Sequence, residues 1–259
     1  MSGPMTEDRL VQATTAAFFR DVLGWDSVYA YNDEVLGANG TLGRRNEGEV
    51  VLTRDLRAAL ERLNPGLPAE AYDQAVSRVV ETSSVKSIVQ INREKYDLYR
   101  NGVPVAVKQP DGAVEDVRLR VFDFGDLSNN RFLVVRELWI AGYPYRRRPD
   151  ILGFVNGVAL LFIELKNVHK DIRHAYDGNL ADYRDTVPHL FDHNALILLS
   201  NGQRAKVGTI TSRFEHFHEW KRLAEGEPGV VDLETALRGL CTKANFMDIF
   251  ENFLLFDES

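Results

Sequence analysis

The sequence predicts an α/β protein in which a central mixed β-sheet is flanked by helices. Three observations predict it: amphipathic helical segments come first, strand-like alternation runs from Tyr99 to Ile140, and helical patterns return after Asp171. The 259 residues are 44% hydrophobic and 27% charged, as in an ordinary globular protein with a sizeable core. We expect one domain, with a mainly helical part (1–92), a sheet-containing core (93–220) and a helical segment (221–259).

Composition narrows the class of protein. The net charge of −7 argues against a general polyanion-binding surface, although a local basic groove stays open. The single cysteine, Cys241, excludes an internal disulfide, disfavours zinc and fits a reducing cytoplasm. No apolar run is long enough to cross a membrane, and no signal segment precedes the first charged residues. We therefore expect a cytoplasmic protein.

The first third of the chain reads as helices. Thr6 is a suitable N-cap for a helix to about Leu23, whose apolar face we expect to carry Leu10, Phe18 and Val22, together with Thr14 and Ala17. Residues 32–48 contain four Gly and three Asn and read as a loop. Further helices are expected at 50–63, before Asn64-Pro65, and at 69–81, while residues 83–92 extend the latter or link onward.

Strands and helices follow in the remaining sequence. Strands are expected at 103–107, 117–124 and 132–140, with a turn at Asp111-Gly112. Two more follow near 150–155 and 158–166, around an Asn156-Gly157 turn that tolerates the positive φ of a tight hairpin. The later elements are a helix at 171–187, strands at 195–200 and 207–211, a helix at 214–223 and a helical segment at 233–256.

Charged residues stand at the ends of the central hairpin. The strand at 158–166 is apolar almost throughout and should be a buried central strand. Its alternation puts Leu160, Phe162, Glu164 and Lys166 on one side, and Asp150 begins the partner strand. Two carboxylates around a small gap suit Mg²⁺, which would assist phosphodiester hydrolysis, with Lys166 placing the attacking water or balancing charge.

The parity of the hairpin is a test of this site. With a regular two-residue loop, Asp150 would face Ile163, on the opposite side from Glu164. A bulge, a longer loop or a bend after Pro149 must therefore reset the register. We predict such an irregularity.

Structural, non-catalytic explanations of these charged residues remain open at this point. An acid-x-Lys triplet alone says little, because Glu219-Trp220-Lys221 repeats it in a context without a strand. Glu164 and Lys166 also fit a structural ion pair at a sheet end. Arg146, Arg147 and Arg148 fit either a local basic groove beside Asp150 or a solubilising loop.

The motifs together resemble a known family. The chain resembles the N-terminal nuclease domain of the restriction (R) subunit of type I restriction-modification enzymes, within the PD-(D/E)xK nuclease superfamily. The resemblance extends from about residue 50 to 220. The matching segments include Val51-Leu52-Thr53-Arg54-Asp55-Leu56, Asn129-Asn130-Arg131-Phe132, Arg148-Pro149-Asp150, Phe154-Val155-Asn156-Gly157, Glu164-Leu165-Lys166-Asn167, Pro188-His189-Leu190-Phe191 and Ser200-Asn201-Gly202.

The resemblance implies roles for particular residues. Asp150 and Glu164 would hold Mg²⁺ and Lys166 would serve the attacking water in the cleavage of double-stranded DNA. The family carries Gln-x-x-x-Tyr on the following helix as support for the site and the DNA. Here Tyr183 matches the tyrosine, but Asn179 stands at the Gln position with a side chain one methylene shorter.

The resemblance also implies a larger assembly. The family's R subunits use ATP to translocate DNA and act with methyltransferase (M) and specificity (S) subunits. This chain has no Gly-x-x-x-x-Gly-Lys-Ser/Thr phosphate loop, so ATP would serve only a motor region beyond Ser259. The alternatives are a non-catalytic docking module of the same complex and a stand-alone nuclease of the same fold.

Overall fold

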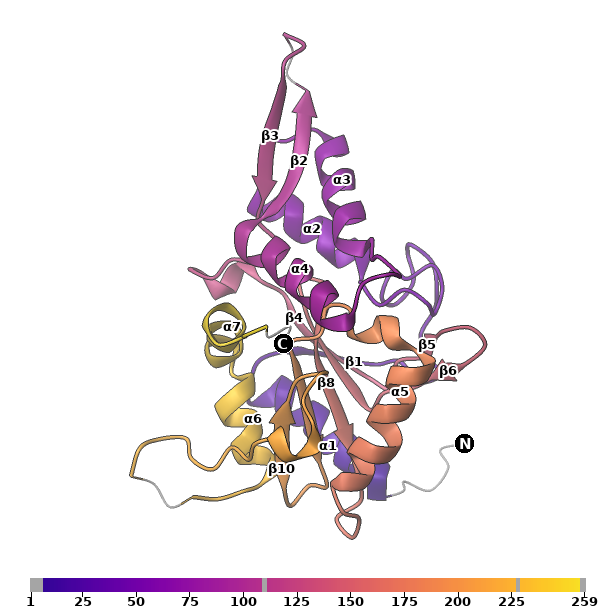
Figure 1. The fold of residues 1–259 in the computed structure, drawn as a ribbon, viewed down its shortest axis with the longest axis vertical. Helices are drawn as coiled ribbons and strands as arrows, with labels where there is room; N and C mark the ends of the chain where they lie inside the picture. The colour runs from indigo at the N-terminus through magenta and orange to yellow at the C-terminus, as the bar shows by residue number, and fades with distance from the viewer. Residues whose placement is uncertain (1–6, 109–110, 227–228, 257–259) are drawn as a thin grey trace.

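The fold is built on one mixed sheet, as the sequence predicts. The structure is a computed structural model and describes residues 7–108, 111–226 and 229–256. Its six-stranded sheet has the order β1-β4-β7-β8-β9-β10 (Figure 1). The pairs β1–β4 and β8–β9 are parallel, and the other neighbours are antiparallel. The strands are β1 (Asp26–Tyr29), β4 (Phe132–Arg136), β7 (Ile151–Val155), β8 (Val158–Leu165), β9 (Leu196–Ser200) and β10 (Ala205–Gly208).

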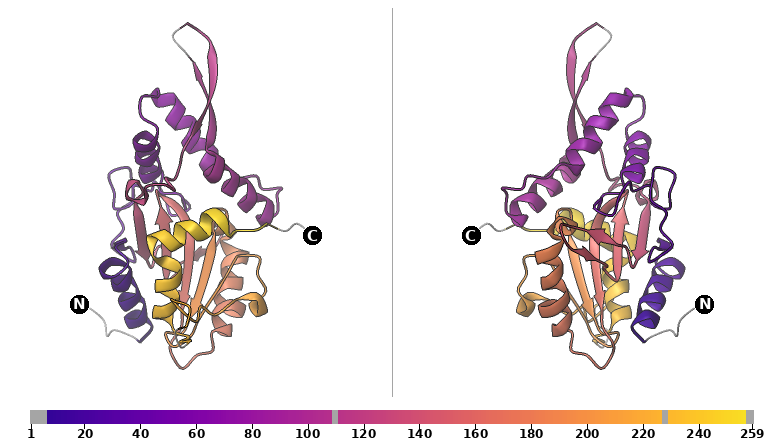
Figure 2. Two further views of the ribbon diagram at one scale, coloured as in Figure 1. Left: turned by 90° about the vertical axis from the view of Figure 1, so that its left-hand side faces the viewer. Right: turned by 90° about the vertical axis from the view of Figure 1, so that its right-hand side faces the viewer.

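Helices cover both faces of the sheet. On one face Phe19 of α1 and Phe246 of α7 belong to the same buried cluster as Ile163 of β8. On the other face Tyr183 of α5 packs with Phe162. Figure 2 shows the sheet between these layers. The helices are α1 (Glu7–Asp21), α2 (Thr53–Leu63), α3 (Ala69–Val80), α4 (Ile88–Asn101), α5 (Ala181–Thr186), α6 (Leu233–Cys241) and α7 (Lys243–Asn252).

Two small hairpins complete the fold. The strands β2 (Val103–Lys108) and β3 (Val114–Leu119) project from the body together with α3 (Figures 1 and 2). The second pair, β5 (Ile140–Ala141) and β6 (Arg146–Arg147), lies between β4 and β7 in the chain. No helix among the described residues is long and apolar enough to span a membrane.

Residues 83–92, expected to extend the preceding helix or to link onward, instead lead into a separate helix, α4 (Ile88–Asn101). Ser87 accepts a hydrogen bond from the Gln90 backbone N–H, and the Gln90 side chain accepts one from the Ser87 N–H. This capping box starts α4, and the Ser-x-x-Gln pattern at 87–90 could have predicted it. The short edge strand β1 also lay outside the predictions. It brings residues from the mainly helical part into the central sheet.

The helix expected at 214–223 is wrong. Only a 3₁₀ turn, Phe214–His216, forms there, and His218 then pairs with Val207 as an isolated β-bridge. Phe217 is buried, where it lies against Gly208. Distant packing partners therefore override the local helical pattern of this segment.

Several predicted boundaries shift without changing the element type. The strand expected at 117–124 is β3 and ends at Leu119, and the strand expected at 132–140 breaks after Arg136. The last helical segment is two helices that meet at Thr242, whose hydroxyl caps α7. Thr6, the expected N-cap of α1, lies outside the described residues.

Candidate active site

The β7–β8 hairpin has the tight turn that Asn-Gly favours. Asn156 and Gly157 have φ values of +47° and +83°, so both adopt the left-handed conformation that this turn requires. Val155 pairs with Val158 across the two-residue loop. The turn is anchored from outside, because the Leu52 N–H donates to the Gly157 carbonyl at 2.8 Å. The turn itself is therefore regular.

A bulge lies just above this turn. Phe154 pairs with Ala159, but the next residue of β7, Gly153, pairs with Leu161. Leu160 is therefore an extra residue in β8. A Cβ on Gly153 would lie 2.9 Å from the Leu161 Cβ, so the crowded strands need glycine at this position. The irregularity predicted from the parity of the hairpin is confirmed.

The bulge places the two carboxylates together. Ile151 pairs with Ile163 at the end of β7, so the register, if continued by one residue, brings Asp150 opposite Glu164. The Asp150 carboxylate reaches the end of β8, where its Oδ2 accepts a hydrogen bond of 2.7 Å from the Leu165 N–H. Leu160 shares a cluster with Ile163, on the opposite face from Phe162. The expectation that Leu160 lies on the Glu164 side is therefore wrong.

Glu164 is buried and only half satisfied. Its side chain is 2% exposed. Oε1 accepts hydrogen bonds from Lys166 Nζ, at 3.0 Å, and from Asn179 Nδ2, whereas buried Oε2 has no hydrogen-bond partner among the described residues. Burial first, and the nearby charge of Asp150 second, raise the pKa of Glu164 to about 8, against the opposing effects of Lys166 and Asn179. A cation bound beside Glu164 would therefore stabilise its ionised form.

Gln12 is a site residue that the sequence analysis missed. It projects from α1, is 7% exposed and donates its side-chain N–H to Asp150 Oδ1 at 2.5 Å. The predicted apolar face of α1 was out of phase, because Leu10, Thr14 and Val22 are exposed. The buried face instead includes Gln12 and Phe19. Its contact with Asp150 spans 138 positions, so no local signal could have found it.

Asn179 and Tyr183 both face the sheet, as their spacing predicts. Asn179 belongs to a π-helical turn, η2 (Ala175–Leu180), which leads directly into α5. Its shorter side chain still reaches Glu164. The Tyr183 hydroxyl donates to the Arg148 carbonyl at 2.8 Å, and its ring packs edge-on against Phe162. Tyr183 thus fixes the backbone two residues before Asp150.

The three arginines before Asp150 each contact an acidic residue. Arg146 and Arg147 form ion pairs with Glu47 and Asp182. Arg148 forms one of 3.3 Å with Glu137. Their side chains are 48%, 28% and 29% exposed, respectively. In this structure their charges are therefore balanced within the protein.

The two carboxylates fit one small hard cation that takes its remaining ligands from water and substrate. No group of three or more His, Cys, Asp or Glu side chains that could hold a metal occurs among the described residues. Mg²⁺ commonly binds proteins through one or two carboxylates and takes its other ligands from waters and substrate phosphates. Asp150 and Glu164 supply such a pair, and the unsatisfied Oε2 of Glu164 is the atom that a cation would engage.

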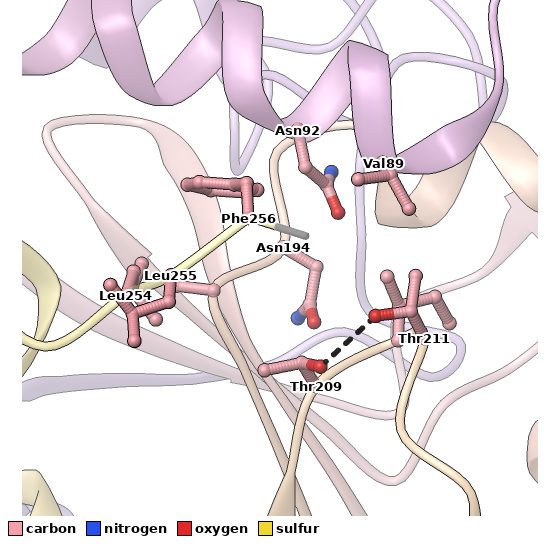
Figure 3. A pocket seen from close by; sticks show the side chains of 10 residues that line it. Val89, Asn92, Asn194, Thr209, Thr211, Leu254, Leu255 and Phe256 are labelled. Atoms are coloured by element: carbon pink, nitrogen blue, oxygen red, sulfur yellow. Dashed lines mark hydrogen bonds between the residues drawn. The ribbon is translucent and has the colours of Figure 1, made fainter. Parts of the chain in front are cut away.

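A separate cavity does not offer this chemistry. It measures about 150 Å³ and lies between α4, the loop after β10 and the last described residues (Figure 3). Its lining includes Asn92, Asn194, Thr209 and Phe256 but no ionisable side chain. This cavity therefore lacks the acidic and basic groups that the predicted chemistry requires.

Comparisons with a family model and with individual known proteins point to the same family. The family model described as "Type I restriction enzyme R protein N terminus" matches residues 4–216. The HindI type I restriction enzyme endonuclease subunit of Haemophilus influenzae is 32% identical over 244 residues, which cover 91% of this chain and 23% of that protein. A protein of Methanocaldococcus jannaschii named "Putative type I restriction enzyme MjaIXP endonuclease subunit" is 22% identical over 83% of this chain and 23% of its own length. The chain thus spans about a quarter of the length of these relatives, and it belongs to the family of type I restriction enzyme R protein N termini.

Proposed function

We propose that this chain is the Mg²⁺-dependent nuclease part of a type I restriction enzyme R subunit and cleaves double-stranded DNA in the cytoplasm. The observation that carries the proposal is buried Glu164 beside Asp150, which accepts from the Leu165 N–H, while Glu164 Oε2 has no hydrogen-bond partner among the described residues. Family membership supports the restriction role. In this proposal Pro149-Asp150 and Glu164-Leu165-Lys166 are the two halves of a PD-(D/E)xK site.

Each residue has a role in this proposal. Asp150 and Glu164 hold the cation, which would polarise a phosphate oxygen and lower the pKa of a bound water. Lys166 lies against Glu164, where its ammonium orients the attacking water and balances charge on the phosphate. Asn179 and Gln12 orient the two carboxylates through their amide N–H groups.

DNA would be held through its phosphates rather than through its bases. Arg146 and Arg147 are the proposed contacts, because phosphates compete with Glu47 and Asp182 for the same guanidinium groups. The ATP-driven motor and the methyltransferase and specificity subunits are proposed to act with this chain in the whole enzyme. The motor would lie in the part of the relatives that this chain does not cover.

Binding of Mn²⁺ as a Mg²⁺ substitute tests the site directly. We expect saturable Mn²⁺ binding in titration calorimetry, and an anomalous peak between Asp150 and Glu164 in Mn²⁺-soaked crystals. The variants D150N and E164Q should lose both signals and remain folded. The control D177N changes an exposed carboxylate on η2 that pairs with Arg173, and it should bind like the wild type. Wild-type protein without saturable binding, with and without a short DNA duplex, would refute the proposal.

A non-catalytic docking module is the second candidate. It is favoured by one observation, namely that all three arginines before Asp150 are balanced by acidic residues. The two readings differ in the parent R subunit. There D150N should abolish cleavage and leave subunit assembly intact if the site is catalytic. Normal cleavage by that variant would support the docking role.

A further inference from the structure

Glu137 is held in an unusual position beside the candidate site. It directly follows β4 and has φ +54°, a left-handed conformation that a non-glycine residue adopts at a cost in free energy. Its side chain is 4% exposed. Its backbone N–H donates to the Asp150 carbonyl at 3.0 Å. A buried acidic residue in a strained conformation at this point calls for a specific role.

The partner of this carboxylate is Arg148. The two side chains form an ion pair of 3.3 Å. The Arg148 guanidinium also lies over the ring of Tyr31, 4.1 Å from its centroid, and 5.1 Å from that of Trp139. Tyr31 and Trp139 are themselves stacked, with 26° between their planes. One carboxylate and two aromatic faces therefore fix where this charge lies.

Without this arrangement, Arg148 has an alternative acidic partner in Asp150. The two residues are separated only by Pro149, and the Arg148 side chain is long enough to turn toward the Asp150 carboxylate. An Arg–Asp ion pair would compete with a cation for the Asp150 oxygens.

We propose that Glu137 is a positioning residue that holds the Arg148 guanidinium on Tyr31 and Trp139, and so keeps the Asp150 carboxylate available to a divalent cation. The inference rests on the proposed metal-dependent function. It adds that cation binding by Asp150 and Glu164 depends on a third acidic residue, Glu137. The φ of Glu137 turns the chain out of β4 and aims its carboxylate at Arg148. The same residue fastens the Asp150 backbone through its N–H.

The test combines E137Q with a second change that removes the competing charge. E137Q keeps the shape of the side chain and loses its charge, so Arg148 is released toward Asp150. We expect Mn²⁺ affinity, measured by calorimetry, to fall about tenfold, which is the size of a modest ion-pair competition. The double variant E137Q/R148M lacks the competitor and should regain wild-type affinity. Crystals of E137Q should show an Arg148–Asp150 ion pair.

A matched control separates this effect from a general loss of charge. Glu47 pairs with Arg146, whose guanidinium lies 3.9 Å from the centroid of the same Trp139 ring. The variant E47Q should bind Mn²⁺ like the wild type. Unchanged affinity in E137Q would overturn the inference, as would a loss that R148M does not reverse. Absence of Mn²⁺ binding in the wild type would instead overturn the proposed function, and this inference with it.

Discussion

Asn179 donates a hydrogen bond to Glu164 from the π-helical turn that precedes α5. A π-turn contains one more residue than an α-helical turn, and such turns are frequent at functional sites. In this chain it carries the amide that reaches the buried carboxylate. Asn179 and Lys166 both donate to Oε1, which leaves the buried Oε2 as the Glu164 oxygen without a hydrogen-bond partner among the described residues.

Removal of the Asn179 amide should weaken metal binding. N179A takes away one of the two donors that orient Glu164, and loss of such a contact typically lowers metal affinity by about tenfold or more. Mn²⁺ calorimetry at fixed pH measures the effect. D177A, which changes an exposed residue on the same turn, is the control. Equal affinities for N179A and wild type would show that the contact does not orient the carboxylate.

Lys166 should affect cleavage more than metal binding. K166M keeps both carboxylates, and it removes one donor to Glu164 together with a positive charge that repels a cation, so the two effects on Mn²⁺ affinity oppose each other. Cleavage in the parent R subunit should fall by about 100-fold or more, because the attacking water loses its positioning cation. The matched control is K221M, which changes the second acid-x-Lys triplet, where Lys221 is 61% exposed. Wild-type cleavage by K166M would remove Lys166 from the mechanism.

Substitution of Asn156 in the hairpin turn should strongly destabilise the protein. The Asn156 side chain is fully buried and donates to the Val121 carbonyl and to Asn130 Oδ1, both at 2.8 Å, while its Oδ1 accepts from the Arg131 N–H. N156G keeps the positive φ but strands these groups, so we expect a loss of about 2–4 kcal/mol in the free energy of unfolding.

The free energy of unfolding of N156A should be about 1 kcal/mol lower than that of N156G, because alanine disfavours the φ of +47°. Urea denaturation of both variants measures the two contributions separately. An N156G protein as stable as the wild type would mean that the buried hydrogen bonds add nothing.

His193 should make the protein sensitive to acid. Its Nδ1 lies 2.6 Å from the Tyr99 hydroxyl in a buried position, and burial together with the charge of Lys95 lowers the pKa of His193 to about 3. Between pH 6.5 and 3 the unfolded chain therefore binds a proton that the folded chain does not. Stability falls as the pH falls through this window, by about 2 kcal/mol at pH 5 from this group.

The variant H193N tests this sign. Asparagine offers an oxygen to the Tyr99 hydroxyl but does not titrate, so the difference in stability between pH 7 and pH 5 should shrink by about 2 kcal/mol. H174N, at an exposed histidine, should keep the wild-type difference. The same pH dependence in H193N and the wild type would assign the acid sensitivity to other groups.

The parts of the site that follow from local rules were predictable. Asn156-Gly157 specifies the turn, and the apolar run before Glu164 specifies a central strand. Side-chain alternation then required an irregularity between Asp150 and Glu164, and the structure has it at Leu160. Fold class, hairpin and bulge therefore came from patterns of a few neighbouring residues.

The parts that depend on distant contacts were not predictable. Gln12 contacts Asp150 through the packing of α1. Glu137 contacts Arg148 through a left-handed backbone conformation that cannot be predicted from a glutamate in the sequence. Trp220 shows the same limit, because it packs against Gly239 of α6 in a segment read as helix. Such contacts are decided by how the elements assemble rather than by their own sequence.

The extra residue in β8 sets a rule for how this stretch can change in evolution. A single insertion or deletion between Asp150 and Glu164 would turn one carboxylate to the other face of the sheet. A second, compensating change in the turn or at the bulge would turn it back. In an alignment, an unpaired one-residue gap in this interval should therefore mark a descendant that has kept the fold and abandoned the chemistry.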